Sequence, residues 1–156
     1  MARRRNHYRD SSFSRGSIAT RNAAVWKALA EMGDNVTQAA KVALKHEAER
    51  IAADAKARCP IYEGTTRADG TKYMDKRVKP GALRDSIKAE PKRGGTYYQI
   101  SANARSEDGF LYGQIVEFSP KVNKPFLYPA MDANRESFIA NMETAIRQAI
   151  KATAKG

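Results

Sequence analysis

Residues 34–60 read DNVTQAAKVALKHEAERIAADAKARCP. Small and branched apolar residues recur here at steps of three and four, the spacing of one face of an α-helix. They are Val36, Ala40, Ala43, Leu44, Ala48, Ile51, Ala52 and Ala55. Asp34 or Asn35 can cap the start of this helix, and Pro60 cannot continue it. Because most of the facing residues are alanines, we expect the helix to pack closely, either on a sheet or against another subunit.

Two more helices are expected on either side of this stretch. Residues 23–32 are mostly strong helix formers, and Gly33 ends them. A final helix follows Pro129 and places apolar residues on one face. These residues are Met131, Phe138, Ile139, Met142, Ile146, Ala149 and Ile150.

Strands are expected between the long helices. Residues 83–90 alternate moderately, and residues 97–102 have the β-branched and aromatic content of a strand. Residues 110–118 form a further apolar segment, bounded by Pro120, in the part of the chain that we interpret as β-structure. The order predicts an α+β domain, in which two N-terminal helices and a long C-terminal helix pack on a small antiparallel sheet.

A polar hairpin is predicted between the second helix and the sheet. Asp69-Gly70 is a strong short hairpin signal, and threonines and a tyrosine flank it within residues 63–75. We expect this hairpin to protrude from the domain.

Composition narrows the class of protein. The chain has 156 residues, a net charge of +11 and 42% hydrophobic residues, which fits one globular domain. No apolar run reaches the ~20 residues that span a bilayer, and the first residues do not resemble a signal peptide. Cys59 is the single cysteine, so an intramolecular disulfide and a cysteine-based zinc cluster are excluded. We therefore expect a basic intracellular interaction protein without a membrane partner.

Positive charge is concentrated at the start of the chain. The first 22 residues contain six arginines and one acid, Asp10. We interpret residues 1–17 as a flexible basic arm and residues 18–156 as a single α+β domain. The arm is either a solvated tail or a segment that binds DNA phosphates or an acidic neighbouring subunit. The candidate contacts are Arg3, Arg4, Arg5, Arg9 and Arg15.

Motifs for catalysis are missing from the sequence. It has no nucleophile elbow, no phosphate-binding glycine loop and no zinc-protease helix motif. Ser86 has no histidine placed to act as its base. Glu117 interrupts an apolar run, and we expect it on the solvent side of its element or in a salt bridge with an arginine of another subunit. We predict no catalytic residue, cofactor or metal site.

Four segments carry a resemblance to a known family. They are AKARCP (55–60), GALRDSI (81–87), YGQIVEF (112–118) and PFLYPAM (125–131). In this order they resemble the small neck proteins of long-tailed, lambdoid-type bacteriophages, the head–tail joining or tail-completion type. The chain departs from the family pattern at Ser119-Pro120, where Gly-Thr is usual, in an apparent insertion at residues 61–80, and in its arginine-rich start.

The resemblance implies a structural role in the virion. Such a protein is made in the bacterial cytoplasm and forms a ring, expected to be hexameric, at the head–tail junction. Its partners would be copies of itself, adjacent head-connector and tail proteins, and the DNA in the lumen. Candidate subunit-interface residues are Arg84, Glu117, Tyr112, Tyr128, Asp69 and Gly70.

Simpler interpretations of these residues remain open. The two charged side chains can lie on a solvated face or form a local ion pair, and the tyrosines can belong to the edge of the core. Two alternative functions also remain: a nucleic-acid-binding protein that uses its basic arm, and a tail-terminator ring protein.

Overall fold

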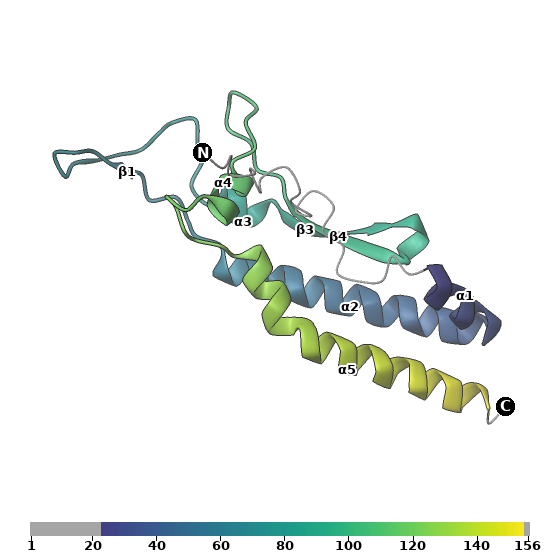
Figure 1. Cartoon of the computed structure of the whole chain (residues 1–156). Coiled ribbons are helices and arrows are strands. Elements are labelled where there is room, and N and C mark those ends of the chain that lie inside the picture. Colours follow the sequence, from purple (N-terminus) through teal and green to yellow (C-terminus); the bar gives the residue numbers. More distant parts are fainter. Residues whose placement is uncertain (1–22, 155–156) are drawn as a thin grey trace, which may run out of the picture.

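Two long helices form the body of the molecule (Figure 1). The computed structural model describes residues 23–154. In it, α2 spans Asp34–Arg58 and α5 spans Leu127–Thr153, and the two helices lie side by side in opposite directions. The shorter helix α1, Ala23–Glu31, packs at the start of α2. The predicted boundary at residue 17 lies outside the described residues.

A two-stranded antiparallel sheet packs on α2. Strand β3 spans Ile87–Lys92 and strand β4 spans Tyr97–Ala102, and their register pairs the first residue of β3 with the last of β4. A short 3-10 turn, η3 (Arg93–Gly95), joins them. Both strands contact α2, so this helix lies between the sheet and α5 (Figure 1). The predicted α+β class, with helices on a small antiparallel sheet, is confirmed.

The alanine stripe of α2 is the centre of the core. Ala40, Ala48 and Ala55 have no exposed surface, and small side chains here allow the flanking elements to approach closely. Larger apolar residues fill the remaining space. The largest that are fully buried are Phe126, Leu44, Ile51, Ile87 and Val36.

Two segments differ from the expected strands. Residues 83–85 belong to a short helix, α3 (Ala82–Asp85), so β3 starts later than predicted. The Ser86 hydroxyl ends this helix by donating to the Leu83 carbonyl oxygen (2.7 Å) and accepting from the Ala104 N–H (3.0 Å). Residues 110–118, also expected to be β-structure, contain a helix, α4 (Gly113–Phe118). Gly113 permits its position, because a Cβ there would lie 2.9 Å from the Ala102 carbonyl oxygen.

The predicted hairpin protrudes from the body (Figure 1). Strands β1, Thr65–Thr66, and β2, Lys72–Tyr73, are antiparallel and exposed. Gly70 has φ +83°, a value that favours glycine, and the Asp69 carboxylate accepts hydrogen bonds from the N–H and hydroxyl of Thr71. We call residues 61–80 the hairpin arm.

At the base of the hairpin arm, the Arg77 side chain pairs with two carboxylates, Asp75 and Asp108. The Asp75 carboxylate accepts hydrogen bonds from the Arg77 side chain and backbone N–H, and this pairing lowers the pKa of Asp75 to about 2. Arg77 also reaches the Asp108 carboxylate at 3.0 Å. The arm is therefore tied to the loop that precedes α4.

Across residues 23–154, no helix is both long and apolar enough to cross a membrane.

Leu44 tests the contribution of the core face of α2. It is 1% exposed, whereas Val42 on the same helix is 56% exposed. Leu44→Ala should lower the free energy of unfolding by about 2–5 kcal/mol, because it leaves a cavity in the core. Val42→Ala, the control, should change it by less than about 0.5 kcal/mol. Urea denaturation measures both, and equal losses would contradict this packing.

Candidate functional site

The Glu117 carboxylate caps the N-terminus of α5. One oxygen accepts hydrogen bonds from the backbone N–H groups of Phe126 (2.8 Å) and Leu127 (3.0 Å), and the other accepts from Tyr128 (2.8 Å). The first N–H groups of a helix have no partner within the helix, and a negative charge there also interacts favourably with the helix dipole. Glu117 thereby joins the end of α4 to the start of α5.

The next two residues of α5 have no backbone N–H group left without a partner. Pro129 is the third residue of α5 and has no N–H, and the Ala130 N–H donates to the Phe126 carbonyl oxygen. The carboxylate therefore satisfies the early donors of a 27-residue helix.

The expected solvent-side position of Glu117 is wrong. The residue is only 6% exposed, because its carboxylate turns inward to the N–H groups of its own chain. A carboxylate can be buried in this way when charge-assisted hydrogen bonds replace water. The sequence signal for the cap was the short distance between the Val-Glu-Phe and Pro-Phe-Leu segments.

A polar cluster that the sequence analysis missed connects α2 with α5. The Arg50 guanidinium donates to the Asn134 side-chain oxygen (2.8 Å) and the Ser137 hydroxyl (2.8 Å) on α5. It also pairs with Glu47 on its own helix, and Glu47 accepts a further hydrogen bond from Asn141 (2.9 Å). These contacts fix the rotation of α5 on α2 more specifically than apolar packing can.

Asn134 extends this cluster toward the end of α2. Its amide nitrogen donates to the Asp54 carboxylate (2.7 Å) and to the Ala130 carbonyl oxygen (2.8 Å). Asp54 in turn accepts from Arg58 at 2.9 Å. The spacing of Glu47, Arg50 and Asp54 along one side of α2 could have indicated such a row.

Three predicted interface residues lie near the end of α2. Burial raises the pKa of Cys59 to about 11, against the opposing effect of the Arg84 charge, while the Glu117 charge raises it further. Burial also raises the pKa of Tyr112, and the Cys59 charge adds to this effect. The structure thus brings Arg84, Tyr112 and Glu117 into the neighbourhood of Cys59.

These residues differ in what they contact. Arg84 is exposed, and its Nε lies 3.7 Å from the Asp85 carboxylate. The Tyr112 hydroxyl is buried and has no hydrogen-bond partner among the described residues. Tyr128 is partly buried, and its ring meets the Phe118 ring edge-on with centroids 5.6 Å apart.

The other predicted contacts are not part of this group. Asp69 and Gly70 lie at the tip of the hairpin arm, away from the helices (Figure 1). Arg3, Arg4, Arg5, Arg9 and Arg15 lie outside the described residues.

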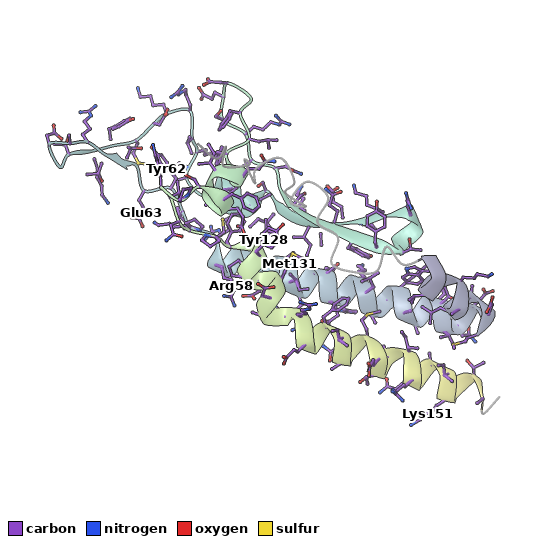
Figure 2. The ribbon with its side chains drawn as sticks, in the orientation of Figure 1. Arg58, Tyr62, Glu63, Tyr128, Met131 and Lys151 are labelled. Atoms are coloured by element: carbon purple, nitrogen blue, oxygen red, sulfur yellow. The ribbon has the colours of Figure 1, made fainter. Side chains whose placement is uncertain are left out.

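A groove lies at the base of the hairpin arm. Its volume is about 560 Å³, and it lies among the arm, α3, α4 and the segment before α5. Figure 2 shows Tyr62 and Glu63, which line it, where the chain leaves α2. Its apolar lining residues include Pro60, Ile61, Leu83, Ile115, Val116 and Val122, and its lysines are Lys72, Lys79 and Lys124. We call this cavity the arm groove.

Among residues 23–154, no three His, Cys, Asp or Glu side chains gather as they would around a metal ion. The Ser86 hydroxyl is held in the hydrogen bonds that end α3. The geometry instead gives a rigid pair of helices, an exposed arm and an adjoining apolar groove.

Comparison with known proteins gives one family. Residues 23–118 match the family model HK97-gp10_like, described as "Bacteriophage HK97-gp10, putative tail-component". The match runs from α1 to the end of α4 and so includes the hairpin arm and the capping glutamate. No curated protein and no solved structure matches the chain.

Glu117→Gln tests the cap. The substitution removes the charge and turns an amide NH₂ toward backbone N–H donors, so the free energy of unfolding should fall by about 1–3 kcal/mol. Glu136→Gln, an exposed glutamate on α5, is the matched control and should leave stability nearly unchanged. Urea denaturation at neutral pH measures both variants. Equal stability of the Glu117→Gln and wild-type proteins would show that the cap contributes little.

Proposed function

Because the chain belongs to the HK97-gp10-like family of phage tail components, we propose that it is a structural ring subunit at the head–tail junction of a virion. In this role it joins or completes the tail and leaves a passage for DNA. It acts by binding other proteins and catalyses no reaction. The ring is proposed to contain six copies, between a head connector and the tail.

Family membership is the observation that carries this proposal, and the architecture supports it. A ring subunit needs a scaffold that keeps its shape and segments that reach a neighbour. Here the capped α5 and the polar cluster fix the two long helices against each other. The hairpin arm extends from this scaffold with both strands exposed.

The proposed interface includes the residues singled out in the sequence. Asp69 and Gly70 would contact a neighbour through the arm tip, and the exposed Arg84 guanidinium would pair with an acidic group there. Tyr112 and Tyr128 would contribute apolar surface at the base. Glu117 would act in assembly by holding the start of α5, since its carboxylate is already engaged within its own chain.

Disruption of the gene in a phage tests the position of the protein. Electron microscopy of the lysate should show DNA-filled heads beside unattached tails, because neither part can be joined without the ring. Supplying the wild-type gene from a plasmid, the control, should restore complete particles.

Other outcomes of that experiment identify other roles. Tails of uncontrolled length would indicate a tail-terminator ring, because such a ring stops tail growth. Intact, infectious particles would overturn the structural role at the junction.

DNA binding is a second proposed property, favoured by the uneven charge of the chain. Five of its arginines lie in the first 17 residues, with one acid. If these contact phosphates, deleting residues 2–17 should abolish a DNA affinity that falls steeply as salt rises. Fluorescence anisotropy with a labelled duplex at several salt concentrations measures this. Affinity that survives the deletion would assign binding to another part of the chain.

A further inference from the structure

We propose that the arm groove of one copy binds the outer face of α5 from a second copy. This contact deepens the proposed function, on which it rests, because it names the surfaces through which ring subunits would meet. The apolar lining and charge of the groove and a matching surface on α5 support it.

The arm groove combines exposed apolar surface with positive charge. Ile61 is 47% exposed, Ile115 39% and Val122 38%, so the groove presents apolar area that nothing in the described chain covers. Three lysines and one acid, Glu63, are its charged lining residues. The Glu63 carboxylate lies 3.9 Å from the Lys72 ammonium nitrogen, and both side chains are exposed. The other two lysines, Lys79 and Lys124, have no acidic partner among residues 23–154. The groove therefore fits an apolar side chain flanked by carboxylates.

The outer face of α5 presents such a side chain. Asp132, Glu136, Ile139 and Glu143 follow one another at steps of four, three and four, so they share one face of the helix. All four are exposed, and Ile139 has half of its surface accessible. Ile139 thus lies between carboxylates. We call these four residues the acidic face.

The charges of the acidic face are only partly balanced within the chain. Glu143 has an exposed partner, Arg147, at 4.0 Å. Asp132 and Glu136 have no ion-pair partner among the described residues, although Arg135 is a neighbour in sequence. Complementary charges favour encounter and register at an interface more than raw affinity. Ile139 entering the groove would supply the apolar contact.

The positions of the two surfaces determine the kind of assembly. The arm groove is lined by the hairpin arm, α3 and α4, whereas the acidic face runs from the sixth to the seventeenth residue of α5. Because the two surfaces are different, their contact is heterologous, and each copy keeps one free groove and one free acidic face. Repetition of such a contact closes into a ring when the rotation between copies permits.

Charge reversal of each surface tests this contact in the full chain. One variant carries Lys79→Glu and Lys124→Glu, and the other carries Glu136→Lys and Glu143→Lys. Sedimentation velocity over a range of protein concentrations should show self-association of the wild type, weakened by at least about tenfold in either variant because like charges then face each other. The association of the wild type should also weaken at high salt.

An equimolar mixture of the two variants is the decisive sample. Each reversed surface then meets an oppositely charged surface of the other variant, so association should return in the mixture. A double reversal on α1 and β3, Lys27→Glu with Lys88→Glu, matches the net charge of the groove variant and should associate as the wild type does. Circular dichroism melts of all variants check that these exposed substitutions leave the fold intact.

Three results would overturn the contact. They are a wild type that stays monomeric at every concentration, variants that associate as strongly as the wild type, and a mixture in which association does not return. Association of the wild type that neither reversal weakens would refute these surfaces and leave the ring role standing. Gene disruption that yields intact particles would refute the ring role, even if the two surfaces bind each other in solution.

Discussion

The position of α5 depends on one carboxylate buried at its N-terminus. Glu117 accepts the N–H groups of Phe126, Leu127 and Tyr128, so the end of a six-residue helix determines where a 27-residue helix begins. The cap replaces water at donors that would otherwise be buried without partners. Everything that α5 contributes, from the polar cluster with α2 to its outer acidic face, follows from this starting point.

From the cap onward, α2 and α5 are joined by two kinds of contact with different physical roles. Apolar packing around the alanine stripe supplies favourable burial but tolerates small rotations. The hydrogen bonds of Arg50 and Asn134 tolerate much less, because a displaced partner would leave a buried polar group unsatisfied. Together they produce a rigid scaffold, which suits a family of virion components that must hold their shape in an assembly.

Features that depend on local periodicity were predicted well from the sequence. The steps of three and four in α2 gave its buried face, and Asp69-Gly70 gave the turn of the arm. Features that depend on tertiary contacts were missed. Residues 83–85 became helical because Ser86 bonds both to Leu83 and to Ala104, eighteen residues away. Glu117 was expected in solvent because its side chain is charged, and its burial is explained only by its contacts with the start of α5.

The hairpin arm is attached through a narrow base. Its turn is closed by its own hydrogen bonds, and at its base the Asp75 N–H donates to the Tyr62 hydroxyl at 3.2 Å. Its strands bury almost nothing against the helices. An element attached in this way can change in length or sequence during evolution at little cost to the stability of the fold. Related phages could therefore vary the arm while the helical scaffold beneath stays the same.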